Sequence, residues 1–161
     1  VLKTAARQTI DIQSPYITFD ESPRWALNEA RRRGVRVRML TEGPITDAMP
    51  VKHASREDYQ ELLDQGIEIA EFQPTMMHTK AVVIDGVVSV IGSANFGNRS
   101  FELNDELTIG VYDRELAVAL IRDFDADWQR STVLNAATWQ DQRSFIGKAQ
   151  ELFWSAFSEV F

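Results

Sequence analysis

Two apolar runs on either side of Asp85-Gly86 constrain the fold of this 161-residue chain more than any other feature. The first run covers residues 81–84, and the second covers residues 87–91 with a single serine inside it. An Asp-Gly pair between apolar runs is a strong signal of a tight β-hairpin, because both residues tolerate a positive φ. Runs without polar alternation indicate strands that are buried on both faces. We therefore expect a hairpin near the centre of a sheet.

Strand-like and helix-like stretches alternate along the chain, which is typical of an α/β domain. Gly34 and Gly66 are expected to end the first two helices. The second of these helices is expected to begin at Ser55, since Asp58 three residues later resembles a capping pattern, and the preceding residues 43–50 are expected to form an irregular loop. The other expected elements are strands over residues 9–17, 35–39, 67–72 and 107–112, a helix from Pro23, and a helix over residues 116–124.

Length and composition indicate a single domain over residues 1–161. Hydrophobic residues make up 44% and charged residues 25%, as in ordinary globular proteins. Residues 138–161 are expected to form a C-terminal amphipathic helix with an unusually aromatic face that packs on the domain or a partner. No apolar run approaches the length that crosses a bilayer. The chain begins with Val and is expected to be a piece of something longer.

The formal net charge of −7 argues against a surface that follows a nucleic-acid backbone, which needs excess Lys and Arg. The chain has no cysteine, so disulfides and thiolate metal sites are excluded. It has two histidines, His53 and His78, which is too few for a histidine-rich metal cluster. We expect neither a metal nor a cofactor.

Four chemically useful side chains flank the predicted hairpin. His78 and Lys80 stand two residues apart where the first strand begins, so both point to the same side of the sheet. Ser93 and Asn95 follow the second strand with the same spacing, after Gly92, which permits close backbone approach. An imidazole, an ammonium, a hydroxyl and an amide can therefore converge on one substrate.

This combination suits the cleavage of a phosphodiester. A neutral imidazole can attack phosphorus, while Lys80 and the amide of Asn95 stabilise charge on the non-bridging oxygens. The attacking imidazole needs a carboxylate on its other ring nitrogen to fix the tautomer. Glu106, at the start of the strand over residues 107–112, is the candidate, and Asp105 is the alternative.

The segments His78-Thr79-Lys80, Asp85 and Gly92-Ser93-Ala94-Asn95 match every specified position of the His-x-Lys-x4-Asp-x6-Gly-Ser-x-Asn motif of the phospholipase D superfamily. Residues 95–106 and Ser14-Pro15-Tyr16 resemble bacterial cardiolipin synthases. The resemblance implies a phospholipase D-like domain, with a mixed central β-sheet flanked by helices. It further implies the C-terminal half of a cardiolipin synthase-like phosphatidyltransferase.

In that family two such domains form one site. One motif histidine becomes phosphatidylated, and the other protonates the leaving alcohol and then activates the acceptor. The resemblance assigns these roles to His78, Lys80, Ser93 and Asn95, and places Glu106 as the acid that orients the histidine. Asp85 belongs to the motif, although its place in the turn explains it without a catalytic role. Ser93 either contacts phosphate or supports the turn.

The resemblance implies a phospholipid substrate such as phosphatidylglycerol, and a second motif half from the same longer chain or from a homodimer mate. It also implies a protein at the surface of the bacterial cytoplasmic membrane, peripheral or cytoplasm-facing. One alternative is a homodimeric phospholipase D-type nuclease, against which the net charge of −7 counts. The other is a non-catalytic interaction module. His53 is expected in a loop away from the motif, so a lone chain lacks a second acid.

Overall fold

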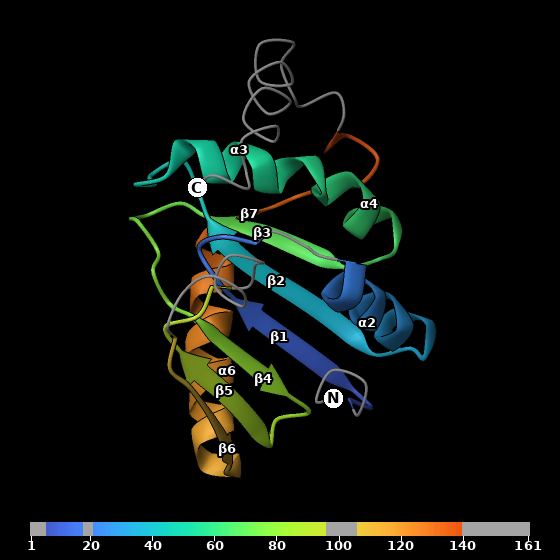
Figure 1. Ribbon diagram of the computed structural model, residues 1–161, viewed down its shortest axis with the longest axis vertical. Helices are drawn as coiled ribbons and strands as arrows, with labels where there is room; N and C mark the ends of the chain where they lie inside the picture. Colours follow the sequence, from blue (N-terminus) through green and yellow to red (C-terminus); the bar gives the residue numbers. More distant parts are fainter. Residues whose placement is uncertain (1–5, 18–20, 96–105, 140–161) are drawn as a thin grey trace.

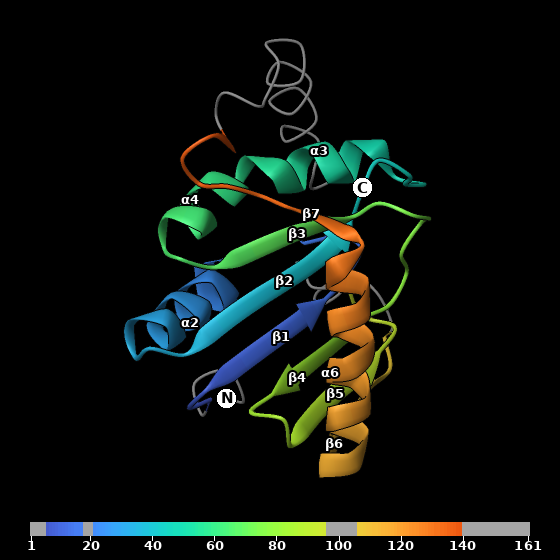
Figure 2. The ribbon, with the colours of Figure 1, turned by 180° about the vertical axis from the view of Figure 1, so that it is seen from behind.

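The computed structural model describes residues 6–17, 21–95 and 106–139. They form a seven-stranded mixed sheet with helices on both faces, which confirms the predicted α/β class (Figures 1 and 2). The strand order is β6-β5-β4-β1-β2-β3-β7. The strands are β1 (Thr9–Gln13), β2 (Arg36–Glu42), β3 (Glu68–Phe72), β4 (Ala81–Ile84), β5 (Val88–Gly92), β6 (Thr108–Tyr112) and β7 (Ser131–Val133). The helices are α2 (Glu21–Arg32), α3 (Met49–Glu57), α4 (Tyr59–Asp64) and α6 (Arg114–Gln129).

The connections decide which strand ends meet. Strands β1, β2 and β3 are parallel because helices join them, whereas β4 pairs antiparallel with β1, with Ala81 opposite Gln13. The hairpin then makes β5 antiparallel to β4, and β6 is antiparallel to β5. Consequently β1, β2, β3 and β5 end where β4 and β6 begin, and Figure 1 shows the arrowhead of β1 beside the start of β4. We call this the site end of the sheet.

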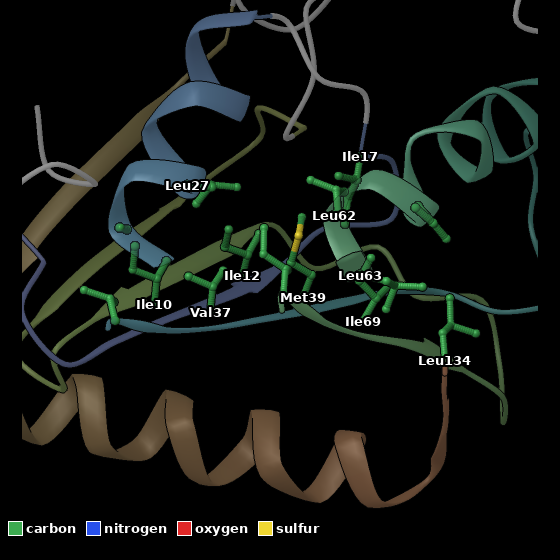
Figure 3. Close-up of a cluster of buried hydrophobic side chains, with 14 of the residues drawn as sticks. Ile10, Ile12, Ile17, Leu27, Val37, Met39, Leu62, Leu63, Ile69 and Leu134 are labelled. Carbon is green, nitrogen blue, oxygen red and sulfur yellow. The ribbon is translucent and has the colours of Figure 1, made fainter. Parts of the chain in front are cut away.

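The larger core lies between the sheet and the helices α2 and α4. Alternate residues of the three parallel strands point to this face, and they meet Leu27 of α2 and Leu62 of α4, both fully buried (Figure 3). Burial of each such side chain contributes roughly 1.5–3 kcal/mol. The residues of the three parallel strands in this core are Ile10, Ile12, Val37, Met39 and Ile69, and Ile84 of β4 joins them.

Helix α6 covers the opposite face, where an ion-pair network adjoins a smaller core. Arg38 of β2 contacts Asp11 at 2.6 Å and Asp125 of α6 at 2.6 Å, and its guanidinium lies 4.7 Å from the ring centre of Phe124. Asp11 is 4% exposed, so loss of Arg38 would leave the Asp11 carboxylate as a buried charge without this ion pair. This network fixes α6 across the sheet, beside the strands that carry the motif.

The hairpin predicted from Asp85-Gly86 is confirmed. Both residues have positive φ, 53° and 63°, and the Val87 N–H donates to the Ile84 carbonyl at 3.1 Å. Strand β4 lies beside the central β1 and is largely buried, as expected. Strand β5 is mostly half-buried instead, because only the edge strand β6 lies beyond it.

Two predicted boundaries and the predicted position of His53 were wrong. The helix expected from Ser55 begins six residues earlier, since Pro50 fits a first helical turn, and Ser55 donates to the Val51 carbonyl at 2.9 Å instead of capping. His53 therefore lies in α3, half-buried, and not in a loop. Strand β1 ends at Gln13, four residues before the predicted Ile17.

The last described strand, β7, was not predicted, because three residues carry too little periodicity to be recognised. The predicted C-terminal helix lies, from residue 140 on, outside the described residues. Among the helices that are described, none has the length and apolar character needed to cross a membrane.

Candidate functional site

The site end of the sheet brings together four of the six predicted site residues. His78 and Lys80 precede β4, Ser93 follows β5, and Glu106 precedes β6. The strand register aligns these positions, since the Gly92 N–H donates to the Lys80 carbonyl at 3.3 Å, and Gly92 pairs with Thr108. A fifth residue, Asn95, is half-buried two positions beyond Ser93.

His78 and Lys80 form a contact pair. The Lys80 Nζ lies 3.1 Å from His78 Nδ1, 3.2 Å from Nε2 and 3.0 Å from the His78 carbonyl oxygen. In either tautomer of a neutral imidazole, one ring nitrogen carries no proton and can accept a hydrogen bond from this ammonium. The His78 side chain is exposed, and the ring is therefore open to a ligand.

Lys80 interacts electrostatically with other residues of the site end. Burial lowers the pKa of Lys80 below its usual value, and the negative charges of Glu106, Asp47 and Glu42 oppose that shift. The negative charges of these acids stabilise the Lys80 ammonium when no phosphate is bound. A bound phosphate would compete with those acids for the ammonium.

Ser93 and Glu106 are hydrogen-bonded across the ends of β5 and β6. The Ser93 hydroxyl donates to the Glu106 carboxylate and accepts from the Leu107 N–H at 3.1 Å. In the described part of the chain, the hydrogen-bond partner of the His78 ring is Lys80, so Glu106 does not lie against the imidazole as expected. Its orienting role stays a prediction, and the alternative Asp105 lies outside the described residues.

Close approach of the strands explains the glycine of the motif. A Cβ at Gly92 would lie 2.2 Å from the Leu107 carbonyl oxygen, which no real side chain tolerates. Any larger residue would separate β5 from β6. That separation would move Ser93 away from Glu106.

Asp85 lies at the opposite end of β4 from His78, and the structure does not bring it to the site. Its carboxylate accepts the backbone N–H groups of Arg7, Gln8 and Thr9 at 2.9, 2.8 and 2.9 Å. Burial raises its pKa, but these hydrogen bonds outweigh burial and hold the pKa below its usual value. The contacts give Asp85 a clear structural task, joining the hairpin turn to the start of β1.

Three acidic or phenolic residues at the site end were not predicted as site residues. Tyr16 follows β1, Glu42 ends β2, and Asp47 lies in the loop after β2. The Tyr16 hydroxyl donates to Asp47 Oδ1. Burial, that hydrogen bond and the nearby charge of Glu42 raise the pKa of Tyr16. The sequence offered one signal for this part of the site: Glu42 places a charged residue at the end of a largely buried strand.

Glu42 is a buried carboxyl group, 1% exposed. Its Oε1 accepts from the Thr46 hydroxyl, whereas Oε2 has no hydrogen-bond partner among the described residues. Burial raises the pKa of Glu42 to about 7; Asp47 and Glu71 also raise it, and Thr46 and Lys52 oppose them. Near neutral pH, Glu42 therefore exists in both protonation states.

We expect Glu42→Gln to flatten the pH dependence of stability. The pKa of Glu42 is about 7 in the folded protein and 4.5 in the unfolded chain, so the folded state binds a proton more tightly than the unfolded state does. The associated stability is complete below pH 4.5 and is lost as pH rises through 7, at most about 3 kcal/mol. Urea unfolding at pH 5 and pH 8 should show a larger loss for the unmodified protein than for the variant. Parallel losses would contradict the prediction.

Glu106→Gln and Asp85→Asn should have opposite signatures in a complete enzyme. Glu106→Gln should slow turnover more, since it removes a charge next to Ser93 and Lys80. Asp85→Asn should chiefly lower stability, by about 1–3 kcal/mol, because an amide cannot accept all three N–H groups. Turnover number and urea midpoint should be measured for both variants. The reverse order would mean that the two roles are exchanged.

No group of three or more metal-binding side chains occurs among residues 6–17, 21–95 and 106–139. The side chains at the site end can perform general acid–base and hydrogen-bonding chemistry. An imidazole can act as a nucleophile, and an ammonium can bind a phosphate oxygen.

Residues 2–128 match the family described as "Cardiolipin synthase, PLD-like domain". A probable cardiolipin synthase of Bacillus subtilis, YwiE, is 35% identical over 98% of the chain and 31% of its own length. The cardiolipin synthase of Geobacillus kaustophilus is 36% identical over 88% of the chain and 28% of its own length. The chain thus spans about a third of the length of these curated relatives.

Solved structures share the fold at low sequence identity. A phospholipase D family member, Nuc of Salmonella typhimurium, has a TM-score of 0.71 at 19% identity, over 83% of this chain and 86% of its own. The phosphatidylserine synthase of Haemophilus influenzae has a TM-score of 0.75 at 14% identity, over 99% of this chain and 41% of its own. At such low sequence identity, these structures show only that the fold is shared.

Proposed function

Because the chain belongs to the cardiolipin synthase family of phospholipase D-like domains, we propose that it forms one half of a phosphatidyltransferase active site. The observation that carries the proposal is the meeting of His78, Lys80 and the Ser93–Glu106 pair at one end of the sheet. The reaction transfers a phosphatidyl group from one alcohol to another. Hydrolysis is the same reaction with water as acceptor.

In the proposed mechanism, an unprotonated nitrogen of His78 attacks the phosphorus of a phospholipid. An N–P bond forms, the P–O bond to the headgroup alcohol breaks, and the product is a phosphohistidine. Lys80 moves its hydrogen bonds from the imidazole to the non-bridging oxygens, where charge accumulates. Asn95 donates its amide to the same oxygens. The acceptor alcohol then gives its proton to the group that protonated the leaving alcohol and attacks phosphorus, and the N–P bond breaks to release His78.

The leaving oxygen needs a proton from a second group. Nucleophile and leaving oxygen lie in line on opposite sides of phosphorus, so one imidazole cannot serve both. The chain has one other histidine, His53, and it is half-buried in α3. Since the resemblance assigns the acid role to a second motif histidine, we place the acid in a second motif half, in the same longer chain or in a second copy.

The edge strand β6 is the surface where we place that second half. It begins two residues after Glu106 at the site end and exposes Ile109 and Tyr112, which are 55% and 82% exposed; Leu107, just before the strand, is 70% exposed. Exposed apolar side chains on an edge strand favour an additional partner. The relatives have a region that can be this partner, because about two thirds of the length of each lies outside the match.

We propose a phospholipid such as phosphatidylglycerol as the donor, and a place at the surface of the bacterial cytoplasmic membrane. The net charge of −7 favours this reading over a nuclease, whose substrate is a dense polyanion. An anionic lipid offers only one phosphodiester for Lys80 to neutralise. If no phosphoenzyme forms, the alternative is that the domain is an interaction module without catalytic activity.

The experiment compares the isolated chain with a reconstituted pair. The chain alone, mixed with dioctanoyl phosphatidylglycerol, should give at most slow covalent labelling of His78, detected by intact mass. Addition of an N-terminal half that carries the other motif should restore steady release of glycerol. The His78→Ala chain is the matched control and should give neither signal.

Steady release of glycerol or phosphatidic acid by a verified monomer would show that one motif suffices. Turnover of a DNA substrate by a homodimer, without lipid turnover, would favour the nuclease. Absence of both labelling and turnover after reconstitution would favour the interaction module.

A further inference from the structure

The loop between β2 and α3, residues 43–48, carries a carboxylate to the site end. Asp47 is exposed and accepts the hydrogen bond of the Tyr16 hydroxyl. Tyr16 lies three residues beyond Gln13, and His78 lies three residues before Ala81, which is paired with Gln13. Both therefore extend past the same end of the sheet. The charge of Asp47 is also close enough to affect Lys80.

Several contacts hold this loop in place. The Thr46 hydroxyl donates to Glu42 and accepts from the Ala48 N–H at 3.1 Å, and Lys52 Nζ donates to the Gly43 carbonyl. A Cβ at Gly43 would lie 1.8 Å from the Phe72 carbonyl oxygen, so the loop lies directly against the end of β3. A carboxylate on a loop fixed in this way has a defined position before any ligand binds.

A carboxylate is a poor neighbour for a phosphate. Lys80 and His78 suit the phosphate oxygens, whereas Asp47 repels them and accepts hydrogen bonds from neutral donors. The part of a phospholipid that can lie against Asp47 is therefore a hydrogen-bond donor of the headgroup, and in the proposed donor, phosphatidylglycerol, that donor is a hydroxyl group. The Tyr16 oxygen, which can accept while it donates to Asp47, offers a place for a second hydroxyl.

We propose that Asp47, held by Tyr16, is a specificity-determining residue that binds a free hydroxyl of a polyhydric alcohol such as glycerol. The proposal rests on the proposed function. A monohydric alcohol has only its reacting hydroxyl, so it cannot use Asp47. A polyol keeps a second hydroxyl for that contact while the first one reacts.

The same contact serves both alcohols of the reaction. The acceptor attacks phosphorus from the side on which the headgroup left, because the two steps are one displacement and its reverse. Asp47 therefore recognises the headgroup of the donor and the hydroxyls of the acceptor alike. Donor preference and acceptor preference should change together when the residue is altered.

The test uses the complete two-motif enzyme, dioctanoyl phosphatidylglycerol as donor, and deuterated glycerol and 1-propanol together as acceptors at equal concentration. Mass spectrometry gives the ratio of labelled phosphatidylglycerol to phosphatidylpropanol. Both products come from one phosphoenzyme, so a slower first step cancels in the ratio. Asp47→Asn should lower it about tenfold or more, as expected for loss of a hydrogen bond to a charged group. Tyr16→Phe should lower it less.

Asp64→Asn is the matched control, since Asp64 is an exposed carboxylate at the end of α4, near the start of β3 and away from the site end. Its ratio should equal that of the unmodified enzyme. In a second arm, phosphatidylglycerol should lose its advantage over phosphatidylpropanol as donor in Asp47→Asn, by a similar factor in kcat/KM.

An unchanged ratio in Asp47→Asn, with an unmodified enzyme that transfers to both acceptors, would overturn this proposal and leave the proposed function intact. No transfer product at all from the unmodified enzyme would overturn the proposed function, and this proposal with it. If Asp47→Asn does not fold, Tyr16→Phe decides: a lowered ratio supports the proposal, and an unchanged ratio overturns it.

Discussion

Replacement of His78 by alanine should abolish turnover in a complete enzyme, with kcat reduced by roughly 10⁴–10⁶-fold, the order observed when one member of a nucleophilic unit is lost. The side chain is exposed, paired with Lys80, and positioned where β4 begins. Release of headgroup alcohol from short-chain phosphatidylglycerol is the measurement.

His53→Ala is the control for that experiment, because it removes the other imidazole of the chain from a helix outside the motif. It should retain most of the turnover if it folds, which a thermal midpoint would verify. Unimpaired turnover by His78→Ala, or loss of turnover by a folded His53→Ala, would exclude the proposed nucleophile.

Lys80→Ala should have the next largest effect, a loss of about 2.7–4 kcal/mol of transition-state stabilisation, or roughly 10²–10³-fold in kcat. The ammonium can reach both ring nitrogens of His78, so it lies within one side-chain rotation of a phosphate that the imidazole attacks. Its described hydrogen bonds all go to His78, and the fold should survive the change. Single-turnover kinetics would isolate the chemical step from substrate binding.

The Lys80→Arg variant tests whether the positive charge alone is sufficient or whether the shape of the ammonium group also matters. Arginine restores the positive charge but presents a planar fork instead of a compact ammonium, so we expect only partial recovery of kcat. An effect of Lys80→Ala on KM alone, with the chemical step unchanged, would mean that the residue attracts the lipid without stabilising the transition state.

Features encoded by neighbouring residues could be predicted from the sequence. The hairpin follows from Asp85-Gly86, whose positive φ values need only those two residues. His78, Lys80 and Ser93 flank that hairpin, so predicting the turn also places them at one end of two paired strands. The motif is thus short-range in structure as well as in sequence.

Contacts between distant segments could not be predicted. Asp47 and Tyr16 are 31 residues apart, and their hydrogen bond depends on the parallel order of β1 and β2. The hydrogen bond of Glu106 to Ser93 instead of His78 depends on the register of β5 with β6. The partners of Asp85 lie 76 to 78 residues away, and nothing in the turn itself identifies them.

The contact of Asp85 with the start of β1 has a consequence for sequence variation. The carboxylate accepts hydrogen bonds from the backbone N–H groups of residues 7, 8 and 9, and the charge of the Arg7 side chain contributes less to its low pKa than these hydrogen bonds do. Those positions can therefore accept almost any residue, whereas proline at any of them would remove a donor. A motif aspartate that binds mainly backbone groups therefore allows the hairpin to pair with amino-terminal strands of many different sequences.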